Sequence, residues 1–175
     1  MAIDESLTFK PINIALLTVS DTRTFENDTS GDILAERIDS AGHKLADREI
    51  SKDNAEVIAA HLHRWIDDTE IDAVVTTGGT GLTGRDVTPE ALNRIKDKDI
   101  PGFGELFRYL SLKSIGTSTV QSRAMAVVAR GTYVFALPGS NGAVKDGWDG
   151  ILAEQLDSRN RPCNFVDLMP RLRER

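Results

Sequence analysis

Apolar residues follow two patterns along this chain, and the two patterns alternate. Four short runs are almost continuously apolar or β-rich, which is typical of strands buried on both faces of a parallel sheet. These runs span residues 12–20, 45–50, 71–76 and 132–137. Between them, apolar residues recur every three or four positions, as they do along one side of a helix. The alternation predicts an α/β fold of three layers, in which a doubly wound, mostly parallel sheet carries helices on both faces.

Local signals set the expected ends of these elements. The run 45–50 is more polar than the other three, so we expect it at an edge of the sheet. Helices are expected over residues 30–41, 54–66, 88–95, 105–112, 120–129 and 141–156. Thr88 is an expected N-cap, with Pro89 at the first helical position. Gly42 should end the first helix, and the run 101–104, Pro-Gly-Phe-Gly, should break the chain.

Length and composition fit a single domain with short flanking segments. The chain has 175 residues, of which 40% are hydrophobic, and this is enough to bury the core of one domain. We expect that domain over residues 12–157. Residues 1–11 mix acids with apolar residues and are expected to form an N-terminal arm. Residues 158–175 hold two prolines and five arginines and are expected to form an irregular C-terminal tail.

Charge and cysteine content narrow the class of protein. The net charge of −6 argues against a nucleic-acid partner, which would call for a basic face. No apolar run is long enough to span a membrane, and residues 1–10 do not have the pattern of a signal peptide. The single cysteine, Cys163, cannot form an internal disulfide and fits a reducing compartment. We therefore expect a cytoplasmic protein without nucleic-acid or membrane partners.

The three histidines and the cysteine offer little chemistry in the sequence. His61 and His63 lie two positions apart, so they would not share a face of a helix. No spacing typical of a zinc site is present. We expect these two histidines and His43 to be surface groups, and Cys163 to be structural or exposed.

A glycine-rich loop follows the third predicted strand. Glycines allow tight turns, and successive backbone N–H groups in such a loop form a concave site for anions. Gly79, Gly81 and Gly84 match the dinucleotide fingerprint G-x-G-x-x-G, but that motif belongs to the first strand and leads directly into a helix. A phosphate-binding P-loop is excluded because Arg85 and Asp86 stand where it needs lysine and a hydroxyl residue. The sequence favours a phosphate-bearing ligand here, with a purely structural turn as the alternative.

Two further loops should meet this one. In parallel sheets, ligands bind outside the carboxyl ends of the strands. The first predicted strand ends in residues 18–23, Thr-Val-Ser-Asp-Thr-Arg, and the last ends in residues 137–142, Leu-Pro-Gly-Ser-Asn-Gly. If the sheet is parallel, these loops and the glycine loop share one edge of it.

Several charged residues near these loops have two interpretations each. Asp86 could hold a divalent cation beside a phosphate, or it could be a charge at the start of a helix. Asp21 could contact a ligand or stabilise a turn. Asp53 also follows a strand, although an acid near a helix start is the simpler interpretation of it. Arg123 and Lys145 could neutralise phosphate or be solvated.

Several motifs in fixed order resemble one family over most of the chain. The matching segments are residues 18–23, 76–81 (Thr-Thr-Gly-Gly-Thr-Gly), 85–91 (Arg-Asp-Val-Thr-Pro-Glu-Ala), 101–105 (Pro-Gly-Phe-Gly-Glu), 122–125 (Ser-Arg-Ala-Met) and 137–140 (Leu-Pro-Gly-Ser). Together they resemble the molybdenum cofactor biosynthesis proteins of the MogA/MoaB type. The final segment, with Leu-Asp-Ser-Arg at 156–159 and Arg-Pro-Cys-Asn-Phe at 161–165, is more similar to the MoaB branch.

The resemblance implies a substrate and a reaction. The substrate would be molybdopterin, a pterin that bears a dithiolene and a terminal phosphate. Active members transfer AMP from ATP to that phosphate with the help of Mg²⁺, and pyrophosphate leaves. Phosphoryl-type transfer is catalysed mainly by positioning and by charge neutralisation.

The resemblance also implies roles for particular residues. The catalytic and metal-binding acids would be Asp53 and Asp86. The nucleotide phosphates would lie against the loop formed by Thr77, Gly78, Gly79, Thr80 and Gly81. Molybdopterin would contact Ser20, Asp21, Glu105, Ser122, Arg123, Pro138, Gly139 and Ser140.

Two functions remain open at this point. The first is a molybdopterin adenylyltransferase, and the second is a non-catalytic protein that binds or carries molybdopterin in the same pathway. The presence of both Asp53 and Asp86 favours the enzyme. A nucleotide binder of another pathway with a flavodoxin-like fold is a more distant third. The resemblance further implies a homo-oligomer, either a trimer or a hexamer, with other cofactor-biosynthesis proteins as candidate partners.

Overall fold

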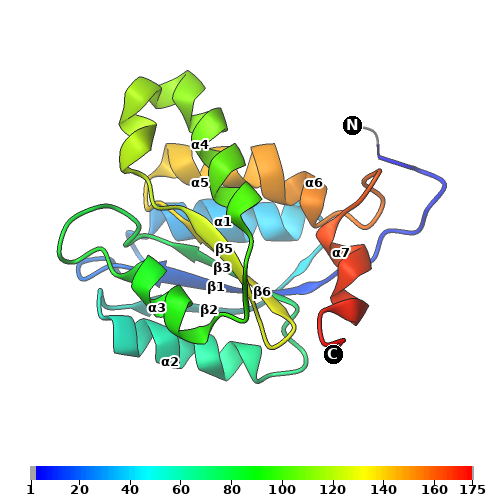
Figure 1. Cartoon of the computed structure of the whole chain (residues 1–175), viewed down its shortest axis with the longest axis horizontal. Coiled ribbons are helices and arrows are strands. Elements are labelled where there is room, and N and C mark those ends of the chain that lie inside the picture. The colour runs from blue at the N-terminus through cyan, green and yellow to red at the C-terminus, as the bar shows by residue number, and fades with distance from the viewer. Residues whose placement is uncertain (1–2, 175) are drawn as a thin grey trace.

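Six strands form one sheet between two layers of helices (Figure 1). The computed structural model describes residues 3–174. The strands are β1 (Asn13–Val19), β2 (Lys44–Ser51), β3 (Ala73–Thr77), β4 (Lys98–Asp99), β5 (Met125–Ala129) and β6 (Thr132–Leu137). The longer helices are α1 (Thr29–Ser40), α2 (Ala55–Ile66), α3 (Thr88–Ile95), α4 (Pro101–Ile115) and α5 (Asn141–Gly147). Shorter turns of helix are η1 (Gly116–Gln121), η2 (Trp148–Leu152), α6 (Ala153–Gln155), α7 (Phe165–Leu168) and η3 (Met169–Arg171).

The order of the strands brings six loops to one edge of the sheet. The order is β2-β1-β3-β6-β5-β4, and the first four strands are parallel. Strand β5 runs antiparallel to β6, and β4 runs antiparallel to β5. The carboxyl ends of β1, β2, β3, β4 and β6 therefore lie at the same edge as the amino end of β5. We call this edge the rim.

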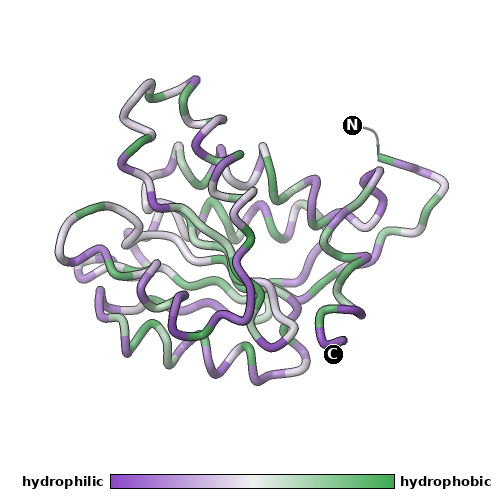
Figure 2. The backbone as a smooth tube through the Cα atoms, viewed as in Figure 1, coloured by the Kyte–Doolittle hydropathy of each residue, from purple (hydrophilic) through white to green (hydrophobic). Residues whose placement is uncertain are grey.

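Alternating side chains of the strands build two cores, one on each face. Successive residues in a strand point to opposite sides. Leu16 of β1 belongs to the same core as Leu34 of α1 and Phe107 of α4, whereas Leu17 belongs to the core that contains Ile58 of α2 and Leu92 of α3. Figure 2 shows the hydrophobic residues concentrated along the central strands. The α/β fold of three layers and its mostly parallel sheet are thus confirmed, with β2 at an edge as expected.

One predicted helix is wrong. Residues 120–129 do not form a helix; the 3₁₀ turn η1 ends at Gln121 and strand β5 begins at Met125. A two-residue turn then joins β5 to β6, with φ of 49° at Arg130 and 90° at Gly131. Positive φ at both positions is typical of the type I′ turn that suits a tight β-hairpin. The antiparallel pairing stabilises this short apolar run as a strand.

Helix starts near the rim also differ from the predictions. Helix α4 begins at Pro101, so the expected break at residues 101–104 is its first turn. Proline suits this position because it has no N–H to satisfy. Thr88 is inside α3 and Val87 is the N-cap residue. The Thr88 hydroxyl is instead used in the glycine loop, as described below.

The N-terminal arm and the C-terminal segment lie on the same side of the domain (Figure 1). Ile3 forms a β-bridge with Asn160, and the Lys10 amide donates to the Ser158 hydroxyl at 2.9 Å. The segment expected to be irregular contains α7 and η3, and Val166 joins the core of one face. The arm and the tail are therefore packed parts of the same unit.

The prediction for His43 is also wrong. Its side chain is buried, lies 5.2 Å from the ring of Phe9, and accepts a hydrogen bond at Nδ1 from the Ile12 amide. Burial lowers the pKa of His43, although Asp157 acts in the opposite direction. Cys163 is exposed, as expected. Within residues 3–174, no helix is long and apolar enough to cross a membrane.

Candidate functional site

The glycine loop is wedged between the ends of β1 and β6. Gly78 has a φ of 102°, and a methyl group at this position would lie 2.2 Å from the carbonyl oxygen of Val19. Only glycine fits such a left-handed and crowded position. The Gly78 amide donates to the carbonyl oxygen of Leu137 at 2.9 Å. These contacts fix the backbone conformation of the glycine loop where it crosses the rim.

Two hydroxyl groups hold this loop in place. The Thr88 hydroxyl donates to the Gly78 carbonyl at 2.8 Å, and the Thr88 amide donates to the Gly79 carbonyl at 3.0 Å. The Thr77 hydroxyl donates to the Pro138 carbonyl at 3.1 Å. Thr77 and Thr88 therefore join three neighbouring elements, and their side chains are already engaged.

Thr80 differs from these two threonines. It is only 2% exposed, and its hydroxyl has no hydrogen-bond partner among residues 3–174. A buried hydroxyl without a partner costs free energy, about 1–3 kcal/mol from mutational data. Thr80 lines a cavity, so a ligand there could supply the missing partner.

Three carboxylates gather on the other side of the loop. These are Asp21 after β1, Asp53 after β2 and Asp86 before α3, and we call them the acidic cluster. The Asp53 amide donates to Oδ1 of Asp21 at 3.2 Å. A methyl group at Gly79 would lie 3.3 Å from Oδ1 of Asp53, and one at Gly81 would lie 2.8 Å from Oδ2 of Asp86. The glycines thus leave room for these carboxylates against the loop.

The acids of the cluster differ in electrostatics. Hydrogen bonding from the Arg85 guanidinium lowers the pKa of Asp21. Burial tends to raise the pKa of Asp86, but hydrogen bonds from the Thr83 hydroxyl and amide outweigh it and the pKa is lowered. The pKa of Asp53 is raised, first by burial and then by the negative charge of Asp21. Of the three acids in the cluster, Asp53 is therefore the one whose negative charge the surrounding groups stabilise least.

A cation would compensate that charge. Within residues 3–174, no group of three or more His, Cys, Asp or Glu side chains is arranged to hold a metal ion. Mg²⁺ does not require such a group, because it is usually bound by one or two carboxylates together with water and substrate phosphates. The raised pKa of Asp53 and its proximity to Asp86 fit that mode of binding.

Arg123 fixes the far end of the glycine loop. Its Nε donates to the Gly81 carbonyl at 2.7 Å, and one terminal nitrogen donates to the Asp86 carbonyl at 2.7 Å. The same guanidinium forms an ion pair with Glu90 of α3. Its own amide donates to the Thr80 carbonyl at 2.9 Å. Arg123 therefore shapes the site through the backbone of the loop, with its charge already paired.

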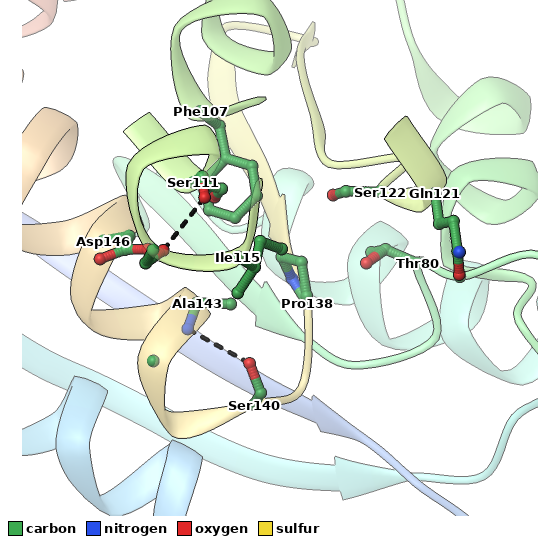
Figure 3. A pocket seen from close by; sticks show the side chains of 13 residues that line it. Thr80, Phe107, Ser111, Ile115, Gln121, Ser122, Pro138, Ser140, Ala143 and Asp146 are labelled. Carbon is green, nitrogen blue, oxygen red and sulfur yellow. Dashed lines mark hydrogen bonds between the residues drawn. The ribbon is translucent and has the colours of Figure 1, made fainter. Parts of the chain in front are cut away.

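An apolar-walled cavity of about 320 Å³ opens on the opposite side of the loop (Figure 3). Its walls come from the glycine loop, α4, η1, the end of β6 and α5. The residues that line it are Thr80, Gly81, Phe107, Ser111, Ser114, Ile115, Gln121, Ser122, Pro138, Ser140, Gly142, Ala143 and Asp146. Such a concave, mostly apolar space with a few polar groups is typical of a small-molecule site.

The loop after β6 forms one wall of this cavity and is held at both ends. The Ser140 hydroxyl accepts from the Ala143 amide at 3.2 Å and caps α5. Arg23 reaches across from the loop after β1 and donates to the Gly139 carbonyl at 3.2 Å. This contact links the first and last loops of the rim.

The predicted site residues fall into three places. Ser122, Pro138 and Ser140 line the cavity, whereas Asp21 belongs to the acidic cluster. Ser20 lines a separate hollow beside Lys52 on the same rim. Glu105 lies elsewhere, in a hollow between α4 and strands β4 and β5. The structure thus does not bring Glu105 to the cavity.

Sequence reasoning missed several residues of the rim. Asp28 is fully buried, caps α1, and accepts hydrogen bonds from Thr18 at 2.6 Å and Arg48 at 3.0 Å. Burial tends to raise the pKa of Asp28, but these hydrogen bonds lower it. Asp146 and Ser111 of the cavity were also missed. The only signal for Ser111 was a small polar residue within the apolar stripe of a helix.

Comparisons with known proteins give a consistent picture. The family described as a probable molybdopterin binding domain matches residues 15–158. Molybdenum cofactor biosynthesis protein B of Escherichia coli K12 is 50% identical over 160 residues, which are 91% of this chain and 94% of that protein. A crystal structure of a molybdenum cofactor biosynthesis protein B superposes with a TM-score of 0.85 at 38% identity, over 95% of this chain and 98% of that one. The tungsten cofactor synthesizing protein MoaB from Pyrococcus furiosus superposes with a TM-score of 0.77 at 34% identity, over 94% and 99% of the two chains.

Proposed function

Because this chain belongs to the molybdopterin-binding family of molybdenum cofactor biosynthesis proteins, we propose that it adenylylates molybdopterin. Its role in molybdenum cofactor biosynthesis follows from the family. In the proposed reaction, an oxygen of the terminal phosphate of molybdopterin attacks the α-phosphorus of ATP. The bond from that phosphorus to the bridging oxygen of the β-phosphate breaks. Pyrophosphate leaves with the bond electrons, and AMP is joined to molybdopterin through a new P–O–P linkage.

The observation that carries this proposal is that one glycine loop separates two unlike half-sites. The acidic cluster suits the charged triphosphate end of the reaction, and the apolar-walled cavity suits a flat organic ligand. The Thr80 hydroxyl, which has no hydrogen-bond partner among residues 3–174, lies between them. A phosphate at this point would meet the loop amides and the Thr80 hydroxyl together.

The residues of the acidic cluster would hold Mg²⁺ through Asp53 and Asp86. Bound there, Mg²⁺ would neutralise part of the charge of the phosphates. Asp21 keeps Arg85 close to the same phosphates, because the two side chains form an ion pair. Arg123 keeps the loop backbone rigid, which favours positioning over adaptation.

One observation favours the alternative of a non-catalytic binding protein. Oδ2 of Asp86 already accepts two hydrogen bonds from Thr83, at 2.8 and 2.7 Å. If Asp86 stays in this arrangement, only one of its oxygens is free of Thr83 and could face a cation. The cavity would then bind molybdopterin without a second substrate.

A direct assay separates the two functions. Purified protein is incubated with molybdopterin, ATP and Mg²⁺, and the products are separated by chromatography. If the protein is an adenylyltransferase, adenylylated molybdopterin and pyrophosphate should form in equal amounts. Neither product should form when Mg²⁺ is chelated. Retention of molybdopterin without any adenylylated product would leave only the binding function.

The same proposal includes a homo-oligomer, either a trimer or a hexamer. Helix α4 and the turn η1 carry a succession of exposed apolar side chains, which we call the apolar row: Leu106, Tyr109, Leu112, Ile115 and Val120. Val120 is 79% exposed and Tyr109 is 61% exposed, which is costly for a row of this length unless another surface covers it. A second copy of the chain would present the same row.

Light scattering tests this contact. Leu112→Asp should reduce the molar mass of the assembly, because it buries a charge in the contact. Leu168→Asp, at an exposed leucine outside the row, serves as the matched control and should leave the mass unchanged. A monomeric wild-type protein would rule the contact out.

A further inference from the structure

Asp146 of α5 is an acid on the wall of an otherwise mostly apolar cavity. Its side chain is half-buried and lines the cavity (Figure 3). Ser114 of α4 lines the same cavity. The Ser114 hydroxyl lies 3.1 Å from Oδ2 of Asp146 and also 3.1 Å from the Ser111 carbonyl oxygen. A hydroxyl has one proton, so it donates to only one of these two oxygens at a time.

The Asp146 carboxylate therefore has unused acceptor capacity. A carboxylate offers about four lone pairs, and at most one of them is engaged by Ser114. Among the ion pairs of residues 3–174, none includes Asp146. A carboxylate without a cation beside an apolar wall favours a ligand that brings hydrogen-bond donors.

A pterin ring has two such donors side by side. Its 2-amino group and the adjacent N3–H point in the same direction, so one carboxylate can accept from both. Such a paired, charge-assisted contact fixes the orientation of the ring as well as its affinity. A flat ring would at the same time pack against apolar groups of the cavity such as Phe107 and Ile115.

We propose that Asp146 is the specificity-determining residue for the pterin ring, accepting hydrogen bonds from its 2-amino group and N3–H. This inference rests on the proposed binding of molybdopterin in the cavity. Figure 3 shows Asp146 and Thr80 at opposite ends of the cavity. With the ring held at Asp146, the phosphate end of the ligand extends toward Thr80 and the glycine loop.

A change in the ligand tests this contact without relying on a variant. The probes are 6-hydroxymethylpterin and 6-hydroxymethyllumazine, which differ because the lumazine carries a carbonyl oxygen in place of the 2-amino group. Both fluoresce, so their dissociation constants can be measured by titration with the full-length protein. We expect the pterin to bind about tenfold more tightly, because the lumazine sets an oxygen against the carboxylate.

Variants then test whether Asp146 is responsible for the preference for the pterin over the lumazine. Asp146→Asn should reduce the ratio of the two dissociation constants to about one, since one donor of the pterin then faces an amide N–H₂. Asp146→Glu, which keeps the charge, should keep a preference for the pterin. Asp149→Asn is the matched control, because Asp149 lies three residues further along, pairs with Arg37 and does not line the cavity. Its ratio should equal that of the wild type.

Three results would overturn the proposal. They are equal affinities of the wild type for the two probes, no measurable binding of the pterin, and an unchanged ratio in Asp146→Asn. The outcome is independent of the AMP transfer assay. A protein that prefers the pterin but forms no adenylylated product would retain this inference and lose the proposed enzyme.

Discussion

The acidic cluster and the cavity lie on either side of one glycine loop, but their side chains differ in chemical character. On one side, the acidic cluster gathers three carboxylates with one arginine, Arg85, in a salt bridge to Asp21. On the other, the cavity is lined mainly by apolar groups and small hydroxyls, with Asp146 as its one acid. A charged group on one side and a flat ring on the other would each find a suitable environment. The difference indicates a site for a ligand, or a pair of ligands, with one charged and one aromatic end.

Asp28, an acid on the rim outside the acidic cluster, shows what a structural carboxylate looks like. Asp28 is fully buried, yet its pKa is lowered because Thr18, Arg48 and the Gly31 amide all donate to it. Asp53 is less buried, yet its pKa is raised. Hydrogen-bond donors of the protein therefore stabilise the negative charge of Asp28, whereas the negative charge of Asp53 is not stabilised to the same extent. The comparison assigns a structural role to Asp28 and supports a ligand-facing role for Asp53.

The largest expected effect comes from breaking the loop that separates the two halves. Gly78→Ala places a methyl group 2.2 Å from a main-chain oxygen and requires a positive φ. We expect the free energy of unfolding to fall by about 3 kcal/mol or more. Urea unfolding measures this, with Gly84→Ala as the control because a methyl group there meets no atom within 4 Å. Equal midpoints for the two variants would contradict the account of the loop.

The next effect concerns the acidic half alone. Asp86→Asn keeps the shape of the side chain but removes its charge, so the rate of AMP transfer should fall on the order of 100-fold. The dissociation constant of molybdopterin should stay within about twofold, because the cavity is on the other side of the loop. Asp67→Asn, at an exposed acid paired with Arg130, is the control for loss of a charge. A parallel loss of binding and rate would show that the halves are not separable.

A smaller effect is expected from the hydroxyl at the boundary of the halves. Thr80→Val should weaken the binding of molybdopterin by about tenfold, because the phosphate loses one donor. It should also stabilise the free protein by about 1 kcal/mol, since it removes a buried hydroxyl that has no partner in the described part of the chain.

Thr76→Val is the matched control for this change. The Thr76 hydroxyl is also buried without a partner among the described residues, but Thr76 does not line the cavity. This variant should be stabilised to a similar extent and should bind molybdopterin like the wild type. If both variants lose binding equally, Thr80 has no specific role.

The smallest expected effect is the contribution of Asp53 to the pH dependence of the free energy of unfolding. Its pKa is raised in the folded protein, so the folded state holds this proton more tightly than the unfolded state. The contribution of Asp53 to stability is therefore present at low pH and is lost as pH rises through its folded pKa. Asp53→Asn should shift the urea midpoint upward at pH 7 relative to the wild type, and this gain should shrink on acidification toward the pKa of an ordinary aspartate. A variant less stable than the wild type at pH 7 would contradict the pKa direction.

Much of the fold could be predicted because buried strands and amphipathic helices leave clear patterns. Three of the four parallel strands, β1, β3 and β6, are nearly continuous apolar runs whose short length and flanking turn residues favour strands, and the more polar β2 fits an edge of the sheet. The run 125–129, Met-Ala-Val-Val-Ala, is too short for its period to separate helix from strand. The decision depends on pairing with β6 and on the turn at Arg130 and Gly131, which is a contact between segments rather than a local propensity.

The sequence allowed the position of the loops to be predicted, but it gave little information about the residues that line the cavity. Loops at the carboxyl ends of parallel strands must share a rim, so Asp21, Asp53 and the glycine loop could be placed together. The cavity depends on how α4 packs over the end of β6, and the spacing of Ser111 and Asp146 in sequence does not indicate that they face the same space. Glu105 lies outside the lining of the cavity for a related reason, because a sequence motif does not specify which side of its helix faces the cavity.

The most direct test of the central claim follows the position of a label through the reaction. The wild-type protein is incubated with molybdopterin, Mg²⁺ and ATP labelled with ³²P at either the α- or the γ-phosphate. Attack at the α-phosphorus predicts that the α label appears in the molybdopterin product and the γ label appears only in pyrophosphate. A γ label in the molybdopterin product, or no label transferred from either position, would contradict the proposed transfer of AMP.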